Sequence, residues 1–280
     1  MVEPAAEAGT ASNPDTLTLV AIAALAYVIE VAVHEHVGHG SACLIMGSHL
    51  KELGAFYSAC DDGALSSMGM RVVASAGPAA SLLLGIVAFL VLRRVPVSRS
   101  LPYYFTWLLG SLGLMSAAGY PVFSGMSGLG DLGMTRDGAL FGAAPEVLWR
   151  IGLTIVGYFG YMYVVKIMCR AIAPCAGAPA LPHLAAARRA TLLSYVAGAV
   201  VYLAIGAFNP LGWTIILASV LPSSMGGTSG LLWMWPIYRR SITTRGDGEG
   251  IHFDRNWTWT GVSIAVIVIY AIFFGPSLRP

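Results

Sequence analysis

The sequence predicts an all-α, polytopic membrane protein with six to seven transmembrane helices, one of them broken near the C-terminal third. Hydrophobic residues make up 56% of the 280 residues and charged residues only 11%, with a mean hydropathy of +0.72. An ordinary soluble domain is about 25% charged. The apolar stretches are continuous and long enough for a membrane helix, which needs about 20 residues, whereas barrel strands are shorter and alternate in polarity.

The elements begin with a polar tail over residues 1–15, which contains no lysine or arginine. A signal peptide begins with a basic region, so we expect the first apolar stretch to be retained. Six stretches are predicted to cross the membrane: Thr16–Val37, Val72–Leu92, Leu101–Tyr120, Glu146–Met168, Thr191–Phe208 and Thr258–Phe274. A seventh, Leu211–Tyr238, contains Pro222, Gly226 and Gly227, so it is predicted to be a broken helix whose free backbone groups are satisfied by protein.

The composition also limits the partners and surroundings. The net charge of +2 offers no basic stripe, so we expect no nucleic-acid partner. The high hydrophobicity excludes a disordered chain, and four cysteines are too few for a disulfide scaffold. We therefore expect an integral protein surrounded by a lipid bilayer, in a plasma membrane of bacterial or archaeal type.

Basic residues between the apolar stretches predict the orientation. They gather in three loops, as Arg93, Arg94 and Arg99; Lys166, Arg170, Arg188 and Arg189; and Arg239, Arg240, Arg245 and Arg255. With seven crossings these loops share one face, which the positive-inside rule assigns to the cytoplasm. The end of the first helix then lies toward the exoplasmic face, together with Cys43 and Cys60, which can pair in an oxidising compartment.

A cluster of ionisable residues stands at the end of the first helix, where such side chains indicate function. This segment contains His34, Glu35, His36 and His39, and Gly38 directly precedes the last histidine. Zinc peptidases place two histidines on one helical face, in the spacing H-E-x-x-H, with the glutamate as general base.

This chain has one more residue between the histidines, which puts His34 and His39 about 140° apart on a regular helix. Two geometries remain open for a metal site. A π-type bulge, which Gly38 favours, brings His34 beside His39; otherwise Glu35 is a ligand and His36 the base. A third interpretation is a polar helix end that lines water without metal.

The pairs His34-Glu35 and Gly38-His39 resemble the H-E-x-G-H signature of the site-2 protease family of intramembrane zinc metalloproteases. Residues 76–81, Ala-Gly-Pro-Ala-Ala-Ser, are similar to the A-G-P-x-x-N element of that family, with Ser81 where asparagine is usual. The resemblance covers about residues 16–133, under half of the chain. The extra residue and Ser81 are departures from the pattern.

A third match runs from Gly119-Tyr120-Pro121 to Gly130-Asp131, and it resembles the N-x-x-P-x-x-x-D-G element without its asparagine. The aspartate of that element is the third metal ligand of the family, which makes Asp131 the expected ligand here. The residues themselves place Asp131 after a glycine-rich run, on the same face as the histidines in a seven-helix chain. The alternative is a loop aspartate paired with Arg136.

The resemblance implies a metalloprotease core over residues 16–133 and further transmembrane helices of the same membrane domain over 134–280. It implies Zn²⁺ held by His34, His39 and Asp131, with Glu35 as the catalytic base. The substrate would be a membrane-embedded protein cut in or near a transmembrane segment. Glu30, one turn before His34, either orients that ring or is a protonated residue within the bundle.

Because the motifs depart from the family pattern, a second function stays open: a non-proteolytic transporter, or a binding or scaffold protein, on a related fold. An iron-dependent oxidase would need further histidine clusters and ranks last.

Family members generally open their metal site toward the cytosol, whereas the basic loops here predict the opposite face. The polar linker at 47–70 is expected to offer an extended edge to substrate, although Leu50–Cys60 alternates poorly in polarity. Neither the substrate-binding residues nor the oligomeric state follows from the sequence.

Overall fold

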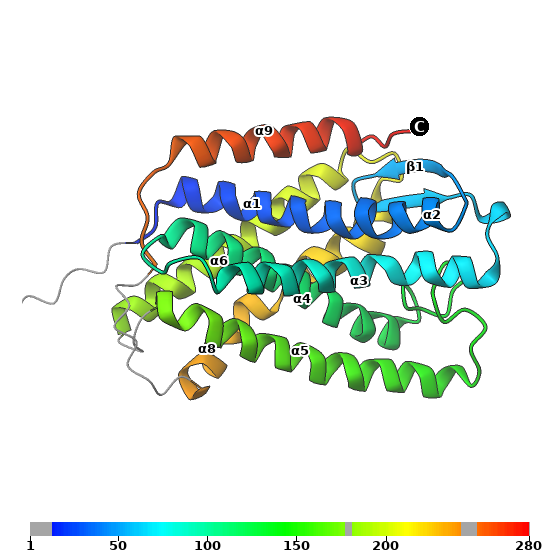
Figure 1. The fold of residues 1–280 in the computed structure, drawn as a ribbon, viewed down its shortest axis with the longest axis horizontal. Helices are drawn as coiled ribbons and strands as arrows, with labels where there is room; N and C mark the ends of the chain where they lie inside the picture. Colours follow the sequence, from blue (N-terminus) through cyan, green and yellow to red (C-terminus); the bar gives the residue numbers. More distant parts are fainter. Residues whose placement is uncertain (1–12, 177–180, 242–250, 280) are drawn as a thin grey trace, which may run out of the picture.

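A computed structural model describes residues 13–176, 181–241 and 251–279, and these form a bundle of long helices with one small hairpin (Figure 1). Within this part of the chain, six helices are long and apolar enough to cross a membrane. The all-α, polytopic class predicted from the sequence is therefore confirmed. Most of the predicted polar tail, residues 1–12, lies outside the described residues.

The helices follow the predicted apolar stretches, with longer ends. Their bounds are α1 Thr16–Ala32, α2 Ser41–Ile45, α3 Ser67–Leu92, α4 Ser100–Ser127, α5 Glu146–Ala176, α6 Leu181–Gly206, α7 Trp213–Ile215, α8 Gly230–Ser241 and α9 Trp257–Phe274. The short or π-helical segments are η1 Val33–Gly40, η2 Asp62–Ala64, η3 Ile216–Val220 and η4 Pro222–Gly227. The first span is continuous from Thr16 to Ile45, because η1 and α2 extend α1 without a break. The helix α4 is not among these six candidate spans, although it is 28 residues long and contains no charged residue.

Successive long helices run in opposite directions, so that the connections alternate between the two ends of the bundle (Figure 1). Backbone and side-chain contacts define one of these ends. Asp15 N donates to Phe253 O at 2.9 Å, and Arg189 Nη2 donates to Thr16 Oγ1 at 3.1 Å. The Ser100 hydroxyl donates to the carbonyl of His252. The described basic residues of the three loops thus gather toward this end, while Arg245 lies outside the described residues.

The helix α1 occupies the centre of the bundle. It is apolar on all sides, as a helix surrounded by protein should be, and it packs against α4, α6 and α9. Its Tyr27 lies so close to Gly198 of α6 that a methyl group added there would be 2.2 Å from the ring. By contrast, α3, α5 and α9 expose many large apolar side chains, which suits contact with lipid.

The predicted broken helix is present over Trp213–Arg240. It begins with α7, continues through the π-helical η3 and η4 and ends in α8, with a turn at residues 228–229. Tyr161 of α5 satisfies backbone groups at this break, since its hydroxyl donates to Gly227 O at 2.5 Å and accepts from Gly230 N at 3.0 Å. A protein side chain thus replaces the helical hydrogen bonds that lipid could not supply.

The linker between the first two spans folds into an antiparallel hairpin of β1 Leu50–Gly54 and β2 Tyr57–Cys60, which the poor alternation in polarity did not reveal. A disulfide between Cys43 and Cys60 ties β2 to α2, as the sequence allowed. Leu278 near the C-terminus bridges to Leu53 on the outer side of β1. The outer edge of β2 pairs with no other strand among the described residues.

Candidate metal centre

The extra residue between the two histidines is accommodated by a π-helix. The segment η1 covers Val33–Gly40, and a π-helix repeats its hydrogen bonds at i, i+5, so His34 and His39 come to lie on one face. Their ring centroids are 5.0 Å apart. Gly38 lies against α3, where an added Cβ would be 2.7 Å from the Cα of Gly77. The π-type bulge that Gly38 favours is therefore present, held by close backbone contact with α3.

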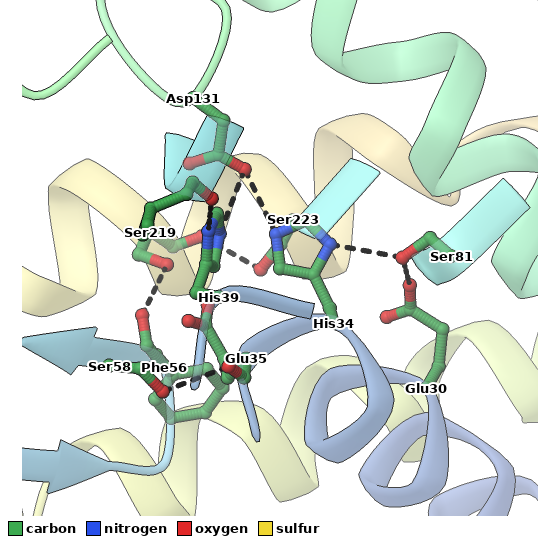
Figure 2. A network of polar contacts seen from close by, with 11 residues as sticks. Glu30, His34, Glu35, His39, Phe56, Ser58, Ser81, Asp131, Ser219 and Ser223 are labelled. Carbon is green, nitrogen blue, oxygen red and sulfur yellow. Dashed lines mark hydrogen bonds and ion pairs between the residues drawn. The ribbon is translucent and has the colours of Figure 1, made fainter. Parts of the chain in front are cut away.

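Three side chains converge on one point (Figure 2). Asp131 Oδ2 lies 3.0 Å from His34 Nε2 and 3.3 Å from His39 Nε2, and the three ligand atoms are all within 4.8 Å of one another. Bonds of about 2.0–2.1 Å to a tetrahedral ion would separate neighbouring ligand atoms by about 3.3 Å. This group could therefore hold a metal ion.

Hydrogen bonds fix which nitrogen of each ring faces the cluster. His39 Nδ1 lies 2.8 Å from Val73 O, which can only accept, so Nδ1 carries the proton. His34 Nδ1 lies 3.0 Å from Ser81 Oγ, whose own proton is donated to Glu30. In the neutral rings both Nε2 atoms then present lone pairs to the Asp131 carboxylate. Such an arrangement requires a positive charge between them, from a cation or from added protons.

The backbone of α3 leaves room for that cation. A methyl group added at Gly77 would lie 2.3 Å from His39 Nε2 and 2.6 Å from His34 Nε2, so only glycine leaves this space free. Two imidazoles and one carboxylate are the ligand set of many catalytic zinc sites, in which a fourth position stays open to water. The donor atoms and the space at Gly77 therefore fit a metal of this type.

The loop after α4 delivers Asp131. Gly128 and Gly130 adopt left-handed backbone angles with φ of 77° and 78°, and Ala139 N donates to Asp131 O at 2.8 Å. Arg150 of α5 fastens the end of α4 through the carbonyls of Gly125 and Met126.

Asp131 forms ion pairs with His34 and His39 and, among the described residues, none with Arg136. Burial alone would raise the pKa of the Asp131 carboxyl. The two imidazoles outweigh this effect and hold its pKa well below the ordinary value.

Glu35 points into a cavity of about 990 Å³ that also reaches His39 and Asp131. It is 5% exposed, and among the described residues none donates a hydrogen bond to its carboxylate. The cavity is lined further by β2, by α4 and α5, and by the broken helix, including Phe56, Tyr57, Ser58, Ser116, Tyr158, Met162, Ser219, Ser223 and Gly226. A carboxylate without a partner beside a metal-type cluster and a cavity is placed to accept a proton from water.

The structure does not bring His36 to this cluster. Its ring faces α9, where it packs at a tilt against Phe274 with ring centroids 4.3 Å apart, and its centroid lies 5.9 Å from that of Tyr270. The alternative in which Glu35 is a ligand and His36 the base therefore finds no support in the geometry.

Two further residues contact the histidines of the cluster, and the sequence analysis did not identify either of them as part of the site. Tyr120 stacks on His34 with centroids 4.8 Å apart, and Gly77 makes room between the histidines and α3. Both lie within elements that the sequence analysis had matched, so their position in a motif was the available signal. The carbonyl of Val73 had no such signal, because every residue carries one.

Comparisons with protein-family models, curated proteins and solved structures find no match to this chain. The function is therefore inferred from the site itself. Its donor atoms, its cavity and its position in a membrane bundle are the observations on which the inference depends.

Proposed function

We propose that this chain is an intramembrane zinc metallopeptidase that hydrolyses peptide bonds in or near the transmembrane segments of other membrane proteins. One observation carries the proposal: His34, His39 and Asp131 converge beside a cavity that Glu35 lines, and no described residue donates a hydrogen bond to the Glu35 carboxylate. The resemblance of the motifs to the site-2 protease family agrees with this proposal. Zinc is the expected metal because its ligand set is two histidines and a carboxylate.

The chemistry assigned to the residues follows from their positions. Zinc, when bound, activates water and polarises the scissile carbonyl. His34, His39 and Asp131 hold the ion, and the hydrogen bonds at both Nδ1 atoms keep the Nε2 atoms turned toward it. Glu35 accepts a proton from the attacking water and passes it to the leaving amine, a role worth about 10²–10⁴ in rate.

The cavity supports a substrate that is an extended peptide. A membrane helix hides its scissile bonds, so it must unwind before hydrolysis, and its freed backbone groups then need partners. The outer edge of β2 borders the cavity, and Ser58 of β2 donates to the carbonyl of Glu35 at 2.9 Å. An unwound segment added along β2 would thus lie beside the proposed base, in a β-addition mode of recognition.

The proposed site opens on the exoplasmic side. The basic loops lie toward the opposite end of the bundle, which is the end that the positive-inside rule assigns to the cytoplasm. The disulfide between Cys43 and Cys60 lies at the same end as the cavity, since Cys60 lines it. Disulfides persist in oxidising compartments, which agrees with this orientation.

The test compares detergent-purified wild-type protein with Glu35→Gln, His39→Ala and Asp131→Ala. Zinc content is measured by mass spectrometry, and cleavage is measured on fluorescently quenched transmembrane peptides in liposomes. We expect about one zinc in the wild type and in Glu35→Gln, and little zinc in the other two variants. Cleavage should survive in the wild type alone.

Asp254→Asn serves as the control, because this carboxylate is exposed at the basic end of the bundle. It should match the wild type in both measurements. Wild-type protein that binds zinc but cleaves no peptide would overturn the peptidase and favour the non-proteolytic binding or transport function. Wild-type protein that binds no zinc after the metal is resupplied would overturn the metal site itself.

A further inference from the structure

A buried chain of hydrogen bonds lies behind the metal-type cluster, on the side away from Asp131 (Figure 2). Ser81 Oγ of α3 lies 3.0 Å from His34 Nδ1 and donates to Glu30 Oε1 at 2.8 Å. The exposures are 0% for Ser81, 3% for His34 and 7% for Glu30. Glu30 therefore reaches His34 through the serine hydroxyl rather than directly.

The direction of these bonds follows from the groups that form them. The Ser81 hydroxyl gives its single proton to the Glu30 carboxylate, so its oxygen accepts the proton of His34 Nδ1. This selects the tautomer in which His34 Nε2 is free to bind a cation. Partners of this kind, placed behind a metal-binding histidine, also raise the basicity of the ring.

Charge gives a second reason to connect Glu30 with a cation. Among the described residues, no lysine or arginine forms an ion pair with Glu30. Its other oxygen lies 3.4 Å from the Tyr202 hydroxyl, which donates at the shorter distance of 2.8 Å to Tyr27 O. An isolated carboxylate inside a membrane bundle is costly. A cation bound at His34 would supply the missing positive charge, transmitted through the Ser81 hydroxyl.

We propose that Glu30 and Ser81 are positioning residues that fix the ring of His34 and strengthen the binding of the metal. This inference rests on the proposed metal site. It assigns two linked contributions, because Ser81 provides the hydrogen bond to His34 and Glu30 provides the negative charge that acts through this hydroxyl. It also gives a reason for serine at position 81, since one small hydroxyl can accept from His34 while donating to Glu30.

The experiment measures the dissociation constant of Zn²⁺ by competition with a chelating dye, in the purified full-length chain. The variants are Ser81→Ala, Glu30→Gln and the double variant. We expect each single variant to bind Zn²⁺ about 10–100-fold more weakly than the wild type. If the two residues acted independently, the loss of affinity in the double variant would be the product of the two single losses. We expect a smaller loss, close to that of the weaker-binding single variant, because both residues act along one chain of hydrogen bonds.

Two controls separate this effect from damage to the bundle. Ser111→Ala removes another fully buried helical serine, whose hydroxyl donates only to Trp107 O of its own helix. Tyr202→Phe removes the hydroxyl that donates to Tyr27 O at 2.8 Å and lies 3.4 Å from Glu30 Oε2, and it leaves the chain from Glu30 to His34 intact. Both should bind Zn²⁺ as the wild type does, and thermal unfolding without metal should be similar across the single variants.

Visible spectra of the Co²⁺-substituted protein give a readout that does not depend on affinity. Ser81→Ala should change the ligand-field bands, because the His34 ring is no longer held. Wild-type affinity and an unchanged spectrum in Ser81→Ala would overturn the proposal. Weakened Zn²⁺ binding in a protein that cleaves no peptide would leave it standing while the proposed peptidase function fails, so the two outcomes are distinguishable.

Discussion

Replacing Gly77 with alanine should abolish metal binding without removing any ligand. The added methyl would lie 2.3 Å from His39 Nε2 and 2.6 Å from His34 Nε2, whereas ordinary van der Waals contact begins at 3.4 Å. Each ring must therefore retreat by about 1 Å, and metal–ligand distances tolerate only about 0.2 Å. Two of the three proposed bonds are lost. We expect the zinc content to fall from about one equivalent to near zero.

The assay is zinc analysis after gel filtration in detergent, together with thermal unfolding of the metal-free protein. Alanine favours a helix by about 1 kcal/mol over glycine, so a loss of zinc cannot come from a weaker α3. Gly152→Ala is the matched control, because no atom lies within 4 Å of the methyl added at that helical position. A Gly77→Ala protein that keeps one zinc with wild-type affinity would refute this reasoning.

Three further predictions concern the scaffold. Reduction of the Cys43–Cys60 disulfide, which closes a loop of 17 residues, should lower the thermal midpoint, since such a loop is worth about 3 kcal/mol in the chain-entropy model; an unchanged midpoint would contradict it. Tyr161→Phe should cost about 1–3 kcal/mol in denaturant titrations, because it leaves buried backbone groups at the break before Gly230 unsatisfied, and a neutral effect would count against the clamp. The pKa of the Asp15 carboxyl is kept below its ordinary value, because Asp15 accepts a hydrogen bond from Thr18 N in the first turn of α1 and forms an ion pair with Arg255. Its stabilising effect is therefore present above about pH 4 and is lost as the pH falls further. The difference in thermal midpoint between wild type and Asp15→Asn should therefore shrink on acidification, and a constant difference would argue against this cap.

Much of the fold followed from the sequence because the signals are local. An apolar run of about 20 residues must be a membrane helix, since backbone groups in lipid can bond only within the helix. The bounds of α3, α5 and α9 therefore lie near those predicted. The hairpin of β1 and β2 was harder to predict, because its strands have no alternating apolar face and are fixed by the Cys43–Cys60 disulfide and the C-terminal segment.

For the candidate site too, some features follow from the sequence and others only from the tertiary structure. The sequence by itself determined which donor types were present and that a five-residue spacing needs a π-helix to bring His34 and His39 together. Only the tertiary structure decided where Asp131 lies, since its loop reaches the histidines through packing of α4 against α5 and α3.

The same holds for Ser81 and Glu30, which lie 51 residues apart in the chain and meet at 2.8 Å. Periodicity describes one helix at a time, whereas a hydrogen bond between two helices depends on how their backbones cross. That crossing is set by close contact at Gly38 and Gly77, and this is the physical reason that the buried chain behind His34 appears only in three dimensions.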